Sequence, residues 1–437
     1  MSEKKGMNRR SFLATAGVVS TGALIPKSNL FAKEESKAEY PRIKDYHVLG
    51  RTGFQVSDIG IGTSRVYSTS IISALLDAGV NYIDTAEGYG RGAAERNIAE
   101  AIKGRDRKSL FITTKIRMRG VTTKDQVIEK VNQCLERLET DYIDCLMNQG
   151  TGSIEDLKDE NFHLAMDELK KQGKVRFVGT ANHGSMHSGQ GESMETILMG
   201  AVEDGRFDVL LVVYNFVQKD AGERIMAAAA QKDIGITIMK SDPLGRYFQM
   251  KERIEQMKKD GEPIDERTTQ YMTRMEATAK QAESFIQENN LTNPSEIKEA
   301  ALKFVLNNPK VHTLNLAFNT FDDIHNYLKL SGTRLKETEK AMLSEYKKNC
   351  GQLYCRHACG ICEPECPHQV PVNTIMRYSR YFDAQSGEKY AMEKYARLET
   401  AKADRCKNCE GFCEKSCPFG VPIQGLLAIV HSELTLV

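Results

Sequence analysis

The chain has 437 residues, with 60 basic and 59 acidic side chains, so its formal net charge is only +1. This balance excludes proteins that hold nucleic acid or an anionic membrane through a strong net positive charge. The length is enough for two or three domains.

Residues 1–32 are predicted to be an export signal that is not part of the fold. The segment carries a twin-arginine motif, Asn8-Arg9-Arg10-Ser11-Phe12-Leu13, then a mildly apolar stretch and a cleavage position near Ala32. The apolar stretch is too short and too weak to span a bilayer, and we expect no membrane span in the mature chain. A chance Arg-Arg pair in a disordered tail is the alternative. The motif predicts a periplasmic protein, exported in its folded form.

Short apolar runs alternate with helical patterns between residues 46 and 328. The eight apolar runs are Asp58–Gly62, Asn81–Thr85, Leu110–Lys115, Tyr142–Met147, Val175–Thr180, Val209–Tyr214, Ile236–Lys240 and Thr313–Ala317. The helical patterns are Ser70–Ala78, Ala93–Lys103, Lys124–Leu138, Asn161–Gln172, Ser193–Glu203, Ala221–Gln231 and Ser295–Asn307. Eight strands alternating with helices predict an α/β fold of the (β/α)8 TIM-barrel type. A doubly wound sheet is the alternative, but the G-x-G-x-x-G fingerprint of many such sheets is absent from the sequence.

The barrel is assigned to residues 33–345, with a helical insertion at about 246–290. This insertion is charged and rich in methionine, and it reads as two helices after the seventh strand. Long loops after barrel strands lie over the face where active sites are found. The insertion is therefore either a lid over the substrate or a solvated helical hairpin.

The barrel segment resembles the aldo-keto reductase family. The resemblance rests first on Tyr82-Ile83-Asp84-Thr85-Ala86-Glu87-Gly88-Tyr89-Gly90, then on Thr113-Thr114-Lys115 and on Asp141-Tyr142-Ile143-Asp144. The run from Lys171 to Gly179 and the pair Tyr214-Asn215 add to it. Leu49-Gly50-Arg51-Thr52-Gly53 is similar to the hairpin that closes the barrel base in that family.

The resemblance implies a catalytic group of Asp84, Tyr89 and Lys115. Tyr89 would donate a proton to a carbonyl oxygen, Lys115 would place a positive charge beside the phenol, and Asp84 would hold Lys115. A phenol has an ordinary pKa near ~10, and it acts as a general acid more readily when that pKa is lowered toward the working pH. Gln149 stands where the family usually has a histidine that orients the carbonyl.

The resemblance also implies cofactor contacts at Asn182, Tyr214 and Lys240. Asn182 follows Ala181, where the family often has serine, and Leu211 replaces a usual glutamine. Near residues 319–326 the sequence has Thr320, Asp322 and Asp323 in place of a basic anchor for a 2′-phosphate. This difference weakens the inference of NADP binding. Because free nicotinamide is scarce outside the cytoplasm, NADP or NAD, if it is used at all, would be exported tightly bound to the protein.

Eight of the nine cysteines in residues 346–437 form two runs. The first run is Cys355, Cys359, Cys362 and Cys366, and the second is Cys406, Cys409, Cys413 and Cys417; each run ends in Cys-Pro. This is the pattern of a two-cluster ferredoxin, in which the fourth cysteine of one run ligates the other cluster. Two [4Fe-4S] clusters are predicted, one on Cys355, Cys359, Cys362 and Cys417, the other on Cys406, Cys409, Cys413 and Cys366.

Zinc sites and disulfides are the alternatives for these cysteines, and both fit the spacing less well. Between the runs, Asn373–Tyr381 and Glu388–Ala403 read as helices. The segment is similar to the helical dicluster ferredoxin domain of respiratory enzymes.

Together these features predict an exported oxidoreductase that acts on a small carbonyl or alcohol, with a sugar as one candidate. Electrons would pass through the clusters to a redox partner protein, and no nucleic acid would be involved. Two other functions stay open. One is an electron-carrier or binding subunit with a degenerate barrel site; the other is a lyase or isomerase that uses Tyr89 and Lys115 for proton transfer.

Overall fold

The computed structural model describes residues 40–64, 68–182, 192–243, 254–260, 266–288, 294–383, 387–399 and 401–435. The predicted signal at 1–32 lies outside these ranges. Residues 40–437 belong to one compact unit. Within the described ranges, no helix has the length and apolar character that a membrane crossing requires.

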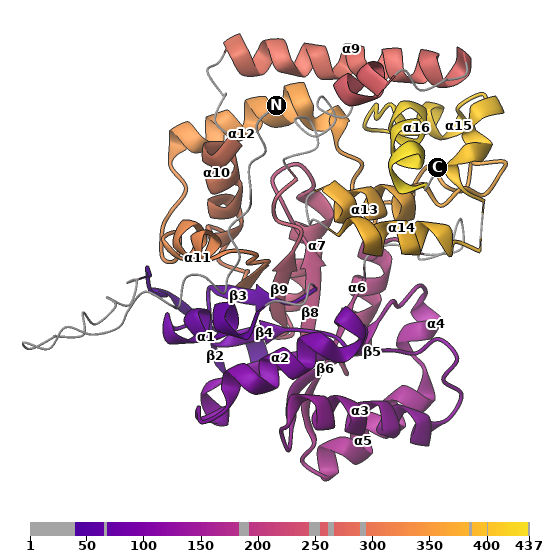
Figure 1. Cartoon of the computed structure of the whole chain (residues 1–437). Coiled ribbons are helices and arrows are strands. Elements are labelled where there is room, and N and C mark those ends of the chain that lie inside the picture. Colours follow the sequence, from indigo (N-terminus) through magenta and orange to yellow (C-terminus); the bar gives the residue numbers. More distant parts are fainter. Residues whose placement is uncertain are drawn as a thin grey trace, which may run out of the picture. The chain divides into compact units, whose positions relative to one another are not determined.

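Eight parallel strands close into a barrel, as the sequence predicted (Figure 1). Each strand pairs in parallel with the next, and the last pairs with the first. The strands are β3 (Ile59–Gly62), β4 (Tyr82–Asp84), β5 (Phe111–Arg117), β6 (Ile143–Gln149), β7 (Val175–Ala181), β8 (Val209–Val213), β9 (Gly235–Met239) and β10 (Thr313–Leu316).

The strands form at the predicted apolar runs because both faces of each strand are covered. All five residues of β8, Val-Leu-Leu-Val-Val, are buried, as are all five residues of β9. Continuous apolar strands are typical of parallel sheets with helices packed outside them.

Helices surround the barrel: the seven predicted ones are present, and Ile154–Leu157 and Phe321–Leu328 form two more that were not predicted. They are α1 (Thr69–Asp77), α2 (Ala93–Ile102), α3 (Lys124–Leu138), α4 (Ile154–Leu157), α5 (Glu160–Lys171), α6 (Met194–Asp204), α7 (Asp220–Ala230), α10 (Pro294–Leu306) and α11 (Phe321–Leu328). Several begin at a side-chain cap: the hydroxyl of Thr123, for example, accepts from Gln126 N at 3.3 Å. Such caps satisfy the free N–H groups of the first helical turn.

The hairpin of β1 (Tyr46–Val48) and β2 (Gln55–Ser57) closes the base of the barrel. At its tip, Arg51 N donates to Asp233 O at 2.6 Å, and the Arg51 guanidinium binds Asp208 at 2.8 Å. Asp208 directly precedes β8 and Asp233 lies two residues before β9, so the tip lies at the N-terminal ends of the strands. Gly50 is needed there, because its φ is +46° and an added Cβ would lie 2.5 Å from Asp233 O.

The C-terminal region is helical and has its own apolar core. It contains α12 (Glu337–Cys350), α13 (Val372–Asp383), α14 (Glu388–Ala396), α15 (Phe412–Lys415) and α16 (Ile423–Leu434). The domain boundary expected between residues 345 and 346 falls inside α12. The helix predicted over residues 388–403 is shorter than expected: it ends at Ala396, where Arg397 N turns back to Glu393 O.

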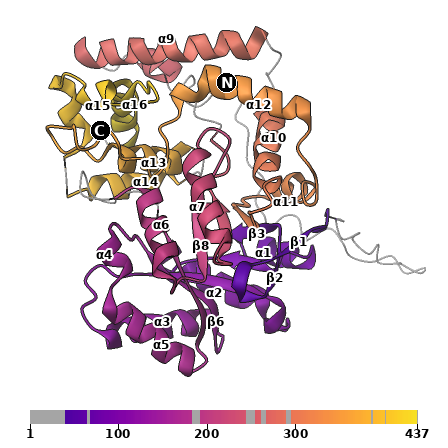
Figure 2. The same ribbon diagram turned by 180° about the vertical axis from the view of Figure 1, so that it is seen from behind.

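The insertion packs against the C-terminal region. It was expected to be either a lid over the substrate or a solvated helical hairpin, and neither expectation includes this contact. Residues 254–260 are helical, and α9 (Glu266–Glu288) packs against α16 and α12, which lie beside it in both views (Figure 2). Tyr271 Oη donates to Cys409 O at 2.8 Å, and Gly425 lets α16 approach closely, since an added Cβ would lie 2.4 Å from Tyr271 O. None of the described insertion residues lines the cavity described below.

Candidate active site

Asp84, Lys115 and Tyr89 come together at the C-terminal end of the barrel. Asp84 is the last residue of β4, Lys115 lies near the end of β5, and Tyr89 follows in the loop after β4. Lys115 Nζ donates to Asp84 Oδ1 at 2.6 Å and to Thr85 O at 2.8 Å. The same nitrogen lies 5.5 Å from the centre of the Tyr89 ring. The sequence motif therefore places these three side chains where barrel enzymes carry their chemistry.

The electrostatics of Tyr89 differ from the expectation. Burial raises the pKa of Tyr89 well above its ordinary value, the negative charge of Asp84 raises it further, and Arg117 opposes these effects. Lys115 is fully buried and forms a close ion pair with Asp84. The expected lowering of the Tyr89 pKa by Lys115 is therefore not seen. The resting phenol stays protonated, which suits a proton donor.

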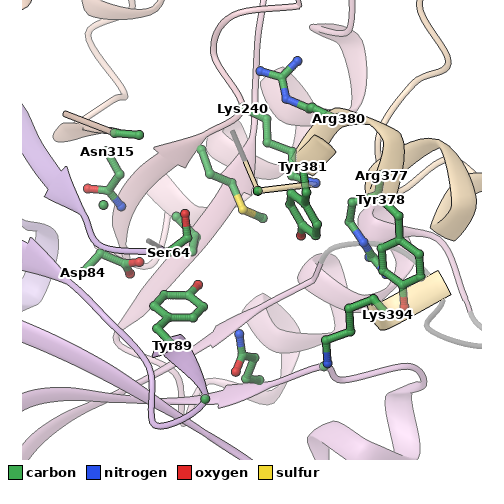
Figure 3. A pocket seen from close by; sticks show the side chains of 18 of the residues that line it. Ser64, Asp84, Tyr89, Lys240, Asn315, Arg377, Tyr378, Arg380, Tyr381 and Lys394 are labelled. Atoms are coloured by element: carbon green, nitrogen blue, oxygen red, sulfur yellow. The ribbon is translucent and has the colours of Figure 1, made fainter. Parts of the chain in front are cut away.

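Tyr89 and Asp84 line a cavity (Figure 3) of about 1080 Å³. Gln149, the last residue of β6, also lines it. Several buried polar atoms of this wall have no hydrogen-bond partner within the described residues: Asp84 Oδ2, Gln149 Oε1 and both amide atoms of Asn315. Buried polar atoms are nearly always satisfied in proteins, so these atoms fit a polar ligand.

Asn315 was missed by the sequence reasoning. It is the one amide in the run Thr-Leu-Asn-Leu of β10. A polar residue near the end of an otherwise apolar barrel strand is the signal that could have found it.

The three predicted nicotinamide contacts do not converge on the cavity. Lys240 lines it and has an unusual positive φ of 57°, which marks a constrained backbone. The Tyr214 ring instead stacks on Phe304, and its hydroxyl accepts from Asn308 at 3.1 Å. Asn182 Nδ2 donates to Thr151 O at 2.7 Å, one layer behind the cavity wall. These residues fit a nicotinamide only in part.

The C-terminal region supplies the opposite wall of the cavity, and the sequence reasoning missed this too. Figure 3 shows Arg377, Tyr378 and Lys394 facing the side that holds Asp84 and Tyr89. Arginines and tyrosines of α13 recur three and four residues apart, so they share a helix face. That basic and aromatic face was the available signal.

The predicted cluster cysteines lie in the arrangement in which the fourth cysteine of one run joins the first three of the other. A small cavity is lined by Cys355, Cys359 and Cys362 of the first run together with Cys417 of the second. Conversely, burial raises the pKa values of Cys406 and Cys413, and the charge of Cys366 raises both further. Four thiols around one space are the donor set that a [4Fe-4S] cluster uses, so these residues fit that cofactor.

The two runs also share a structural repeat. In each run a Cys-Glu pair precedes the Cys-Pro, and the glutamate accepts from a backbone N–H ten residues later. Glu363 Oε1 accepts from Asn373 N at 2.7 Å, and Glu414 Oε1 accepts from Gln424 N at 2.8 Å. The described residues hold no group of three or more ligands arranged for a single metal ion. A four-iron cube is larger than one ion, so its thiolates stand farther apart.

Comparison with known proteins agrees with the barrel. The sequence profile of the aldo/keto reductase family matches residues 52–348. An uncharacterized oxidoreductase, YqkF, of Bacillus subtilis (strain 168) is 34% identical over 148 residues, which cover 31% of this chain and 47% of that protein. The methylglyoxal reductase DkgB of Escherichia coli O157:H7 is 35% identical over 126 residues, covering 28% and 46%.

The chain thus spans about half the length of these curated relatives. Among solved structures, an aldo-keto reductase from Bacillus halodurans is 20% identical with a TM-score of 0.49; the match covers 70% of this chain and 96% of that one. Since the profile match runs from the hairpin at the barrel base into α12, the chain belongs to the aldo/keto reductase family.

Proposed function

We propose that this protein is an oxidoreductase that interconverts a carbonyl and an alcohol at the barrel cavity. The observation that carries the proposal is the group of Asp84, Lys115 and Tyr89 at the C-terminal ends of β4 and β5, opening on that cavity. The order and position of these residues match the motif from which the family resemblance was first drawn.

Tyr89 is the group that moves the proton. In the reducing direction, the carbonyl carbon gains a hydride and the oxygen gains the proton of the Tyr89 hydroxyl. An alkoxide is a stronger base than a phenolate, so this transfer is downhill even though the pKa of Tyr89 is raised. The ion pair of Lys115 and Asp84 forms part of the site beside Tyr89. The neutral amide of Gln149 can hydrogen-bond to the carbonyl oxygen.

Two kinds of cofactor belong to the proposal. A nicotinamide, as tightly bound NADP or NAD, supplies or accepts hydride when it is present. Lys240, whose Nζ lies 3.2 Å from His357 Nδ1, and the unpartnered amide of Asn315 line the cavity and would meet such a ligand there, although Tyr214 and Asn182 lie elsewhere.

The clusters are the second kind of cofactor. Cys355, Cys359, Cys362 and Cys417 would hold one [4Fe-4S] cluster, and Cys406, Cys409, Cys413 and Cys366 the other. Such clusters exchange single electrons, which implies a redox partner protein. The cavity that four of the thiols line supports this assignment.

Export through the twin-arginine route is also proposed, with a periplasmic location. Its support is the motif Asn8-Arg9-Arg10-Ser11-Phe12-Leu13 together with the eight cysteines. A protein whose clusters are assembled in the cytoplasm must cross the membrane already folded, and the twin-arginine route permits this.

An electron-carrier subunit without hydride chemistry is the second candidate. The positions of Tyr214 and Asn182 favour it, because neither side chain reaches the cavity. Identifying any nucleotide released on denaturing the anaerobically purified protein separates the two candidates. Stoichiometric NADP or NAD supports the reductase, whereas no nucleotide and no binding on titration supports the carrier.

Replacing Tyr89 with phenylalanine tests the catalytic role. Aldehyde reduction would be followed with NADPH and, separately, with reduced methyl viologen as the electron source. Loss of a positioned general acid lowers kcat by about 10²–10⁴-fold, with KM little changed. Tyr46→Phe is the matched control, since Tyr46 is 41% exposed at the barrel base. Unchanged turnover in Tyr89→Phe would remove the mechanism.

A further inference from the structure

The wall of the cavity holds an excess of positive charge. Eight basic and five acidic side chains line it. Each acidic side chain already has a partner: Asp84 binds Lys115, Asp156 and Asp159 cap helices, Asp242 lies near Lys298, and Glu399 binds Arg119. Each acidic side chain of the wall thus contacts a partner other than Arg117 and Lys394.

Arg117 and Lys394 face this cavity from opposite walls. Arg117 is the last residue of β5, and Lys394 lies on α14, where its Nζ sits 5.5 Å from the centre of the Tyr390 ring. Within the ranges that the structure describes, neither side chain has a carboxylate within salt-bridge distance. Both are partly buried, so each cation loses part of its hydration without a close ion pair in compensation, and Glu393 acts on Lys394 only from beyond salt-bridge distance.

Arg117, Arg377, Lys394 and Arg397 all line this one cavity. Burial lowers the pKa of Lys394, and the positive charges of Arg117, Arg397 and Arg377 lower it further. Like charges this close repel one another, so the arrangement is unfavourable until an anion arrives. The tyrosine rings of the same wall add hydroxyl groups: Tyr381 lies 5.9 Å from Tyr390, between ring centres.

The cations also lie beside the proposed proton donor. Arg117 affects the pKa of Tyr89 directly. A Cβ added to Gly88, the residue before Tyr89, would lie only 3.5 Å from Arg117 Nη2. An anion held by Arg117 would therefore be part of the molecule that reacts at Tyr89, and not a distant phosphate of a nucleotide.

We propose that the substrate carries an oxyanion, such as a carboxylate or phosphate, which Arg117 of β5 and Lys394 of α14 hold next to Tyr89. The proposal rests on the carbonyl–alcohol activity proposed above and names its substrate class. Because Lys394 belongs to the C-terminal region, that region selects the substrate as well as carrying the cysteine runs.

The test compares two aldehydes that differ by one charge, 4-formylbenzoate and 4-formylbenzamide. Their binding to the anaerobically purified full chain is measured by calorimetry without any reductant, so the result does not depend on turnover. Charge-assisted hydrogen bonds predict that the wild type binds the benzoate about tenfold more tightly. Arg117→Gln and Lys394→Gln should each remove most of this preference, whereas Arg117→Lys, which keeps the charge, should retain part of it.

The matched control is Lys389→Gln. Lys389 is exposed on the same helix as Lys394 and does not line the cavity, so its loss should leave the preference intact. Equal binding of the two aldehydes by the wild type, or no benzoate binding at millimolar concentration, would overturn the proposal.

Two further results separate this proposal from its neighbours. If loading with NADP abolishes the benzoate preference, the cations serve the nucleotide and the proposal fails. If the preference is present but Tyr89→Phe leaves turnover unchanged, the anion site stands and the proposed catalytic mechanism fails.

Discussion

Replacing Cys417 with serine is predicted to empty the cluster site of the first cysteine run, not the second. Cys417 belongs to the second run in sequence, yet it lines a cavity with Cys355, Cys359 and Cys362. With two four-iron clusters the wild type should contain about eight irons, and each single ligand variant should keep about four.

Double variants test this exchange by the number of irons that each variant retains. Cys362→Ser with Cys417→Ser removes two ligands of the same site, so about four irons should remain. Cys413→Ser with Cys417→Ser removes one ligand from each site, so almost no iron should remain. Iron and sulfide are counted on full-length protein purified without oxygen, and electron paramagnetic resonance identifies the cluster that survives.

The control for general damage is Cys350→Ala. Cys350 is a buried thiol directly before the first run, and it does not line the cavity. Its replacement should leave the iron count unchanged. The opposite pattern would refute the exchange. In that case Cys413→Ser with Cys417→Ser would keep about four irons, and Cys362→Ser with Cys417→Ser would lose all its iron. Each run would then hold its own cluster.

Two more predictions concern the stability of the barrel. Lys115→Met leaves the Asp84 carboxylate buried without its partner, so the free energy of unfolding in urea should fall by about 3–5 kcal/mol, and adding Asp84→Asn should restore most of it; no recovery in the double variant would show that the ion pair is not the cause. Burial lowers the pKa of His163, whose ring binds Leu157 O at 2.7 Å. The unfolded chain therefore takes up a proton first as the pH falls below about 6.5, and stability is lost in that range. His163→Gln should flatten the fall in Tm between about pH 7.5 and 5.5, and an unchanged slope would contradict this.

The barrel could be predicted from the sequence because each strand corresponds to a separate apolar run. Every predicted strand overlaps an observed one, since a strand buried on both faces needs such a run. The positions of Asp84, Tyr89 and Lys115 followed in turn, because a barrel brings all strand ends to one face.

Side-chain direction and long-range packing were beyond this reasoning. Whether the Tyr214 ring faces the cavity depends on Phe304 and Asn308, which are about ninety residues further along the chain. Likewise, α9 is amphipathic whether it covers a substrate or a neighbouring helix. Its contact with α16 depends on the small size of Gly425, which a hydrophobic pattern does not reveal.

Helix α13 contacts both the loop of the first cysteine run and the barrel cavity. This constrains which substitutions the helix can accept. Its first turn holds the loop of the first cysteine run, where Asn373 Nδ2 donates to Arg356 O at 2.6 Å. Its next turns, with Arg377 and Tyr381, face the barrel cavity. A substitution that adapts this helix to a new substrate will therefore also disturb the surroundings of the cysteines. If the proposed clusters are present, substrate preference and cluster reduction potential should vary together among related chains.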